Sequence, residues 1–192
     1  PLSLPNALGP IGVFDSGVGG LSVLKELLAQ LPDESYLYVG DGAHCPYGPR
    51  GHEEILRLSR GVTDYLLSAG AKAVVVACNT ISAAALDTLR ATYPHIPFIG
   101  MVPAVKPAAR ATRSGVVGVL ATPATFGGRL YEGVVEHHAN GVRVISTACP
   151  GLVERVEAGD LDGPETMALL RRYLTPLLDA GADAIVLGCT HY

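Results

Sequence analysis

A thirteen-residue segment occurs twice in this chain of 192 residues, and it constrains the fold more than any other sequence feature. Residues 66–78 align without gaps with residues 177–189, and eight of the thirteen pairs are identical. Both copies read as a helix end, a glycine turn, a short apolar strand and a cysteine, which is Cys78 or Cys189. A glycine turn before a strand is common, but a cysteine at the same offset in both copies is not generic. The chain is therefore expected to contain two copies of one α/β unit.

Short apolar runs alternate with helical periodicity along the rest of the chain. Strands are expected over residues 11–15, 35–40, 72–77, 98–100, 115–120, 142–146 and 183–187, with helical segments between them. Apolar strands separated by helices are typical of parallel sheets that are covered on both faces. We therefore expect an α/β fold of two similar, pseudo-symmetric, doubly wound domains, with the active site in the cleft between them.

The division between the domains is expected near residue 100, where the proline-containing segment 101–107 looks like a crossing point. Residues 1–99 would form the first α/β domain and residues 100–192 the second. A weaker echo of the repeat supports this division, because Gly12-Val13-Phe14 is similar to Gly118-Val119-Leu120.

Composition and charge exclude several classes of protein. The net charge is −4 and the basic residues are scattered, so no nucleic-acid partner is expected. No apolar stretch approaches the roughly eighteen residues of a membrane span, and residues 1–10 do not resemble a signal peptide. Four cysteines lie far apart, which favours a reducing cytoplasm over a disulfide scaffold. Because no CxxC or HExxH is present and His44-Cys45 is the only adjacent pair of potential ligands, no metal site is expected.

Polar clusters follow three of the expected strands at their carboxyl ends. They are Asp15-Ser16-Gly17, Cys78-Asn79-Thr80 and Cys189-Thr190-His191. Ligands of parallel α/β sheets bind beyond these strand ends. If the two halves face each other, Cys78 and Cys189 lie on opposite walls of one cleft.

Two thiols on opposite walls suit the inversion of a carbon stereocentre by proton transfer. Such a reaction needs a base on one face of the carbon and an acid on the other, and the two exchange roles in the reverse direction. Only the thiolate is a competent base, and a free cysteine titrates at about 8.5. A helix N-terminus following each cysteine would favour the thiolate. Asn79 or Thr80 is expected to cap a helix that begins at Ile81.

Other polar residues and the remaining cysteines are also candidates for roles at this site. Asp15 either caps a turn or assists the acid–base chemistry, and His191 could transfer or stabilise the proton of Cys189. Cys45 and Cys149 are expected to be small buried hydrophobic residues. The other histidines are expected to be structural or on the surface; they are His44, His52, His95, His137 and His138.

A glycine-rich loop follows the first strand, but it completes no nucleotide-binding motif. Ser22 stands where GxGxxG needs its third glycine, so residues 17–20 are expected to form a tight turn that could present N–H groups to an anion. The lysines Lys25, Lys72 and Lys106 have no convincing Schiff-base setting, which argues against a pyridoxal enzyme.

Taken in order, four blocks of this sequence resemble the glutamate racemases of the cofactor-independent aspartate/glutamate racemase superfamily. The blocks are residues 13–21, residues 38–41 with 46–48, residues 77–80 and residues 187–192. The resemblance implies that Cys78 and Cys189 are the two proton donors and acceptors, and that Asp15, His191 and Glu157 assist them. It implies that the substrate-binding residues are Asp15, Ser16, Tyr47, Gly48, Asn79, Thr80, Thr125, Thr190 and His191.

The resemblance has further implications for the whole protein. It implies a small-molecule substrate (glutamate), no cofactor, a cytoplasmic enzyme that forms a homodimer, and a product, D-glutamate, for bacterial peptidoglycan synthesis. The sequence departs from the family at Ala124, where relatives usually have glycine. The family also continues beyond the segment 189–192, completing the second domain and returning to the first.

Two alternatives stay open on the sequence alone. One is a sister racemase acting on aspartate, a hydantoin or a malonate, although Thr190-His191 favours glutamate and the presence of both cysteines disfavours single-cysteine relatives. The other is a non-catalytic α/β protein that binds a small dicarboxylate. Such a protein would need the same cleft but no duplicated cysteine.

Overall fold

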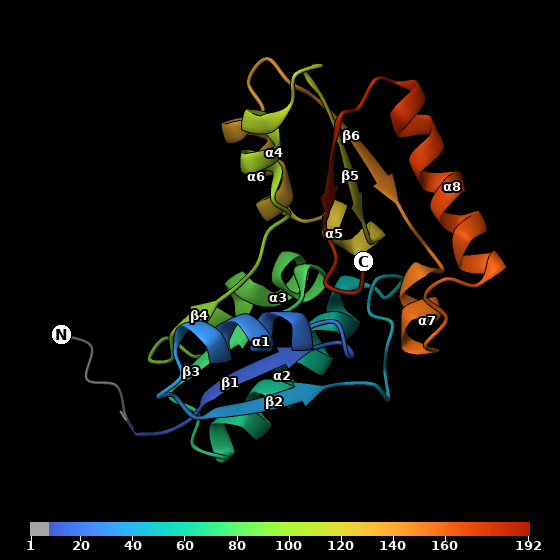
Figure 1. Cartoon of the computed structure of the whole chain (residues 1–192). Helices are drawn as coiled ribbons and strands as arrows, with labels where there is room; N and C mark the ends of the chain where they lie inside the picture. The colour runs from blue at the N-terminus through green and yellow to red at the C-terminus, as the bar shows by residue number, and fades with distance from the viewer. Residues whose placement is uncertain (1–7) are drawn as a thin grey trace.

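The computed structural model describes residues 8–192, which form two parallel β-sheets in two domains (Figure 1). The first sheet has the strand order β2-β1-β3-β4 and the second has the order β6-β5-β7. The elements of the first domain are β1 (Ile11–Asp15), α1 (Leu21–Gln30), β2 (Tyr36–Gly40), α2 (His52–Ser68), β3 (Ala73–Val76), α3 (Asn79–Thr92) and β4 (Phe98–Ile99). Those of the second are α4 (Val105–Ala111), β5 (Val116–Ala121), α5 (Pro123–Phe126), α6 (Arg129–His138), β6 (Arg143–Ala148), α7 (Leu152–Glu157), α8 (Pro164–Asp179) and β7 (Ala184–Leu187).

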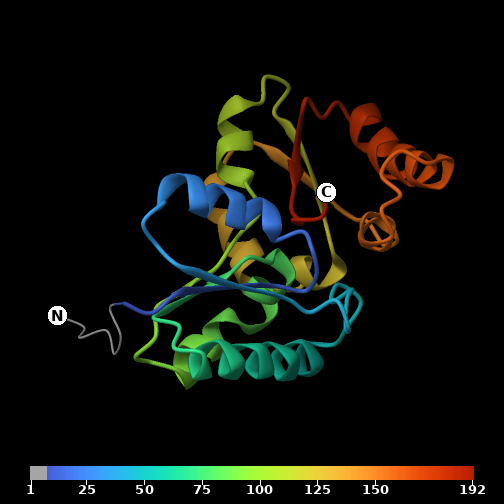
Figure 2. The ribbon, with the colours of Figure 1, turned by 60° about the horizontal axis from the view of Figure 1, so that its bottom comes forward.

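Helices cover both faces of each sheet, as the continuous apolar strands predict. In the first domain α1 lies on one face, while α2 and α3 lie on the other (Figure 2). Successive β1 residues therefore enter different cores, since Val13 packs toward α1 and Phe14 toward α2 and α3. In the second domain α8 packs on one face of the sheet, and α4 and α6 pack on the other.

The repeated segment has the same backbone hydrogen bonds in both domains. Ala71 N–H donates to the Leu66 carbonyl at 3.1 Å, and Ala182 N–H donates to that of Leu177 at 3.0 Å. The glycine between them has a positive φ in each copy, 84° at Gly70 and 86° in the second domain, a backbone state that glycine adopts without strain. The predicted duplication is therefore confirmed in the local structure.

The weaker echo also has a structural counterpart. Gly12 pairs with Val74 across the first sheet, and Gly118 pairs with Ile185 across the second, so the repeats share one register. A Cβ added at Gly12 would lie 3.1 Å from the Leu66 side chain, and one at Gly118 would lie 2.7 Å from that of Leu177. Glycine at these two positions thus lets α2 pack closely on the first sheet and α8 on the second.

Most expected elements are confirmed, but the start of α3 is wrong in the sequence-based prediction. The helix begins at Asn79 with Cys78 as its N-cap residue, and no side chain caps it. The Cys78 carbonyl accepts the Ser82 N–H at 2.9 Å, so the first helical turn starts directly after the strand. The Thr80 hydroxyl bonds to the other domain, which removes it as a cap. Within the described residues, no helix is both long and apolar enough to cross a bilayer.

Candidate active site

The three polar clusters at the strand ends come together between the two domains. Thr190 Oγ1 lies 3.5 Å from Asp15 Oδ2, and Ser16 Oγ lies 3.9 Å from Cys78 Sγ. Cys78 and Cys189 come from different domains and are 3% and 8% exposed. Both thiols are free, and the charge of Cys189 affects the pKa of Cys78, so they lie within electrostatic reach of each other.

Burial determines the protonation of both thiols. It raises the pKa of Cys78 well above the ordinary value, and the charges of Asp15 and Cys189 raise it further. Burial likewise raises the pKa of Cys189 to about 12. The N–H groups of Ile81 and His191 favour the thiolates as expected, but burial outweighs them. The backbone N–H groups therefore act in the predicted direction, but burial is the larger influence and raises the pKa of both thiols above the ordinary value.

Asp15 caps the turn after β1 from a fully buried position. Its Oδ2 accepts the Gly20 N–H at 2.7 Å. Burial raises the pKa of Asp15, opposed mainly by the electrostatic influence of the nearby His191 and by a hydrogen bond from Cys78. A carboxylate with a raised pKa beside a thiol is well suited to accept that thiol's proton. The capping role is thus observed, and the geometry leaves room for the acid–base role.

The glycine loop, residues 17–20, is one of the places at which the second domain contacts the first closely. A Cβ at Gly17 would lie 2.0 Å from Glu157 Oε1, and one at Gly19 would lie 2.7 Å from His191 Nδ1. The N–H of Val18 donates to Glu157 Oε1 at 2.8 Å. The loop does present its N–H groups to anions, as predicted, but these anions are protein carboxylates.

Cys189, His191 and Glu157 form a chain of polar contacts. His191 Nδ1 lies 3.9 Å from Cys189 Sγ, and His191 Nε2 lies 2.5 Å from Glu157 Oε1. Burial raises the pKa of Glu157, but the Val18 N–H, His191 and the Cys45 thiol together hold it below its ordinary value. Glu157 therefore stays ionised, and an Nε2–H donated to it leaves Nδ1 free to accept a proton from the thiol.

Three threonine hydroxyls join the domains on another side of the thiols. Thr80 Oγ1 lies 2.8 Å from Thr122 Oγ1, which lies 3.0 Å from Thr125 Oγ1. All three residues are buried. Sequence reasoning missed Thr122, although a threonine before Pro123 is a recognisable helix N-cap.

The other predicted binding residues differ in what they offer a ligand. Asn79 is 5% exposed, and its Oδ1 is the one buried side-chain polar atom among the described residues without a hydrogen-bond partner. Such an orphaned acceptor next to Cys78 suits an ammonium group. The Tyr47 hydroxyl instead donates to Asp41 at 2.6 Å, and Gly48 packs on Thr122. In this structure the Tyr47 hydroxyl is thus already paired with a carboxylate.

Cys45 and Cys149 have different surroundings. Cys149 is 2% exposed in the core beneath α8, as predicted. Cys45 is only partly buried and lies beside Glu157 and His191, so the expectation of a simple buried hydrophobic residue is wrong there. This contact depends on the approach of the second domain, which no local sequence pattern encodes.

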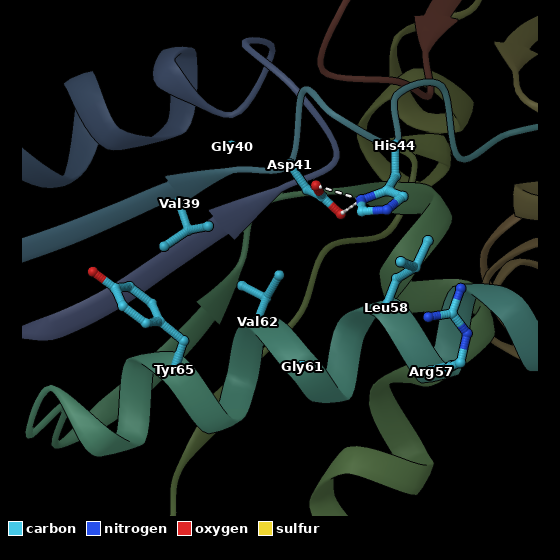
Figure 3. A pocket seen from close by; sticks show the side chains of 9 residues that line it. All are labelled: Val39, Gly40, Asp41, His44, Arg57, Leu58, Gly61, Val62 and Tyr65. Carbon is cyan, nitrogen blue, oxygen red and sulfur yellow. Dashed lines mark hydrogen bonds and ion pairs between the residues drawn. The ribbon is translucent and has the colours of Figure 1, made fainter.

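A cavity between β2 and α2 lies apart from this constellation (Figure 3). It has a volume of about 340 Å³, and Val39, Leu58, Val62 and Tyr65 line it. His44 lies at its rim, 2.8 Å from Asp41, in the exposed position that the sequence predicts. None of the strand-end residues lines this cavity, so it does not serve the chemistry of the thiols.

The chain is similar to known proteins over nearly its whole length. The model of the family described as Asp/Glu/Hydantoin racemase matches residues 11–192. A glutamate racemase of Roseiflexus sp. is 63% identical over 183 residues, which are 95% of this chain and 67% of the relative.

Two solved structures are similar over the same extent. Glutamate racemase of Francisella tularensis in complex with D-glutamate has a TM-score of 0.82 at 36% identity, covering 96% of this chain and 69% of that one. Glutamate racemase of Escherichia coli, in complex with L-glutamate and the activator UDP-MurNAc-ala, has a TM-score of 0.83 at 36% identity, covering 95% and 70%. Both similarities cover at least 95% of this chain and therefore include both domains. The chain belongs to the Asp/Glu/Hydantoin racemase family.

Proposed function

We propose that this chain is a glutamate racemase that interconverts L-glutamate and D-glutamate with Cys78 and Cys189 as its two acid–base groups. The observation that carries the proposal is the pair of buried thiols, which occupy equivalent repeat positions in two domains and face one polar cluster. Relatives of this chain are named glutamate racemases, and the two similar structures hold D-glutamate and L-glutamate.

The proton transfer balances without a cofactor. One thiolate removes the α-proton from one face of the substrate and becomes a thiol. The electron pair left on the α-carbon is delocalised into the α-carboxylate. The opposite thiol then donates its proton to the other face and becomes a thiolate, so each turnover moves the negative charge from one sulfur to the other.

The neighbours of each thiol can form the initial thiolate. Asp15 would take the proton of Cys78, because burial raises its pKa. Nδ1 of His191 would take the proton of Cys189, and the ionised Glu157 would stabilise the resulting imidazolium through Nε2. Each half-reaction would thus have its own proton acceptor.

Polar groups around the thiols would orient the substrate. We assign the Asn79 Oδ1 acceptor to the ammonium group, since that atom has no other partner. The hydroxyls of Ser16, Thr80 and Thr190 are assigned to the two carboxylates, with Thr125 holding Thr80 through Thr122. Burial of both thiols means that the domains must separate to admit glutamate and close again to exclude water.

The remaining proposals concern the whole protein. We propose that the boundary between the domains lies between residues 99 and 100, because β4 completes the first sheet and α4 packs in the second domain. Residues 1–7 lie outside the part of the chain that the structure describes. The free thiols suit a reducing cytoplasm. The family resemblance supports a homodimer and a supply of D-glutamate for peptidoglycan synthesis.

Incubation of the protein with L-glutamate in deuterated water, without pyridoxal phosphate, tests the proposed reaction. The expected result is deuterium at the α-carbon together with D-glutamate. A parallel incubation with L-aspartate tests the sister reaction. Glutamate binding without exchange would instead identify a dicarboxylate-binding protein, and exchange on aspartate alone would identify the sister racemase.

A further inference from the structure

Three metal-ligating side chains from separate parts of the chain meet at the edge of the proposed active site. They are Cys45, Glu157 and His191, and one ligand atom from each lies within 4.8 Å of the other two. Cys45 is in the loop after β2, Glu157 ends α7, and His191 follows β7. The first comes from one domain and the other two come from the second.

The ligand set has the chemistry of a zinc site. A thiolate, an imidazole and a carboxylate are the three ligand types that Zn²⁺ prefers, and three protein ligands plus water complete a tetrahedron. Zinc bonds of about 2.0–2.3 Å separate tetrahedral ligands by roughly 3.5 Å. Ligand atoms within 4.8 Å of one another therefore need only a small inward shift.

The cluster is open to an ion from solvent on one side. The Glu157 side chain is 24% exposed and Cys45 is partly buried, whereas the His191 side chain is 1% exposed. The carboxylate and the thiol thus form the outer side of the site, and the imidazole forms its floor. Cys189 lies behind His191, since its Sγ lies 3.9 Å from the other ring nitrogen.

We propose that Cys45, Glu157 and His191 form an inhibitory zinc site that ties the two domains together beside the catalytic thiols. On binding, the Cys45 thiol releases its proton to solvent and the ring proton of His191 moves from Nε2 to Nδ1. The Cys45 sulfur, His191 Nε2 and a Glu157 carboxylate oxygen then each donate an electron pair to the ion. The inhibitory effect rests on the proposed racemase function, whereas the binding does not. The sequence motifs predicted no metal site, and the present proposal departs from that prediction because the cluster joins positions that are far apart in the sequence.

Zinc at this position would stop catalysis for two reasons. With the metal on Nε2, the remaining ring proton lies on Nδ1, so His191 can no longer accept the proton of Cys189. The metal also bonds Cys45 of the first domain to two residues of the second. It would therefore oppose the separation of domains that substrate binding requires.

Direct binding is measured on the purified, metal-free chain with Zn²⁺ by calorimetry, and with Co²⁺ by the thiolate-to-cobalt absorption band. One ion per chain and a cobalt–thiolate band are expected. Cys45→Ser should abolish the band, while Cys149→Ser, which changes a buried thiol outside the cluster, should leave it intact.

In a second test, Glu157→Gln should weaken Zn²⁺ binding at least about tenfold, the loss that even an outer-shell change produces. Unchanged binding in both Cys45→Ser and Glu157→Gln would overturn the proposal.

Inhibition is measured on the same proteins as the racemisation rate against Zn²⁺ concentration. Serine keeps a hydrogen-bond donor for Glu157, so Cys45→Ser should retain basal activity and need at least about tenfold more zinc for half-inhibition. A chelator should restore the wild-type rate. Equal sensitivity of Cys45→Ser and wild type would show that zinc acts on the catalytic thiols, and it would overturn the proposal. Absence of racemisation in every protein would refute the proposed function, while the cobalt and zinc titrations would still test the site.

Discussion

Cys78 and Cys189 occupy equivalent positions in the two repeats, yet their polar neighbours are not equivalent. Cys78 lies beside Asp15 and Ser16, whereas Cys189 lies beside His191 and, through it, Glu157. The repeat therefore accounts for the matched thiols, but the groups that we propose as their proton acceptors differ between the two halves. We expect the two directions of the proposed reaction to depend differently on Asp15 and His191.

Replacement of either proposed catalytic thiol should abolish most of the activity. Cys78→Ser and Cys189→Ser should each lower the racemisation rate by at least about 10²-fold, the usual contribution of one positioned acid–base group. Circular dichroism at a glutamate band measures the rate. Cys149→Ser is the matched control and should keep nearly the full rate, because Cys149 lies in the core beneath α8. Full activity in either catalytic variant would refute the two-thiol mechanism.

Stability should fall as the pH rises through the alkaline range. Unfolded cysteines titrate at about 8.5, whereas burial raises the pKa of Cys189 to about 12 and that of Cys149 to about 11. Between these values the unfolded chain binds fewer protons than the native one, so the free energy of unfolding decreases with increasing pH. The contribution of the buried thiols is complete below about pH 8.5 and is lost toward pH 12.

Urea unfolding at pH 8 and pH 10 under reducing conditions measures this effect. The midpoint should be lower at pH 10, and Cys149→Ser should reduce the difference, because one raised thiol is then missing. A midpoint that does not change between the two pH values would contradict the assigned shifts.

In each domain a helix packs against a glycine of the central strand, and this packing is tighter in the second domain. A Cβ at Gly118 would meet Leu177 at 2.7 Å and Ile185 at 2.8 Å, whereas one at Gly12 would meet Leu66 at 3.1 Å and Ala71 at 3.3 Å. At contacts under 3 Å the neighbouring side-chain ends must move, and the Leu177 side chain is fully buried, so it has little space to do so. A side chain at Gly118 of β5 is thus tolerated less well than one at Gly12 of β1.

Alanine substitutions at these two glycines should therefore differ in effect. Gly118→Ala should destabilise the protein by about 1–3 kcal/mol, as overpacking does, and Gly12→Ala should cost less. Thermal unfolding followed by far-ultraviolet circular dichroism gives the ranking. If Gly12→Ala were the more damaging, the assigned packing of α8 on β5 would be incorrect.

The arrangement of the whole molecule depends on contacts that cross between the domains. Glu157 and His191 lie so close to Gly17 and Gly19 of the glycine loop that no side chain would fit at either glycine. Thr80 and Thr122 form a second crossing on another side of the thiols. Because the catalytic groups are shared between the domains, the site exists only when both crossings are formed.

Gly17→Ala should separate activity from stability. The new methyl group would lie 2.0 Å from Glu157 Oε1, so this flexible side chain should move away and lose its bonds to Val18 and His191. We expect kcat/KM for glutamate to fall about tenfold or more, the size of an outer-shell loss, with a nearly unchanged melting temperature. Gly61→Ala is the matched control, because nothing lies within 4 Å of its Cβ, and it should keep full activity and gain about 0.5–1 kcal/mol. A fully active Gly17→Ala would show that Glu157 does not support His191.

The sequence by itself determined the parallel α/β architecture, the two halves and the thiol pair. Hydrophobic periodicity, which depends only on neighbours along the chain, predicts the strands and helices. The two halves and the thiol pair follow from the repeated segment. The strand-end position of Asp15, Cys78 and Cys189 is equally local, because a parallel sheet places its carboxyl ends at one edge. Glu157 entered the predicted site only through the family resemblance, since nothing near it in the sequence distinguishes it from other surface carboxylates.

Only the tertiary structure decided how the two halves share their groups. It brought Thr122 to Thr80, Glu157 to the glycine loop, and Cys45 to His191, all of them contacts between distant positions. It also decided which influence on the pKa of the thiols is larger. A helix N-terminus can be recognised in a sequence, but the loss of solvent that raises the pKa of Cys78 and Cys189 occurs only when the domains close over them.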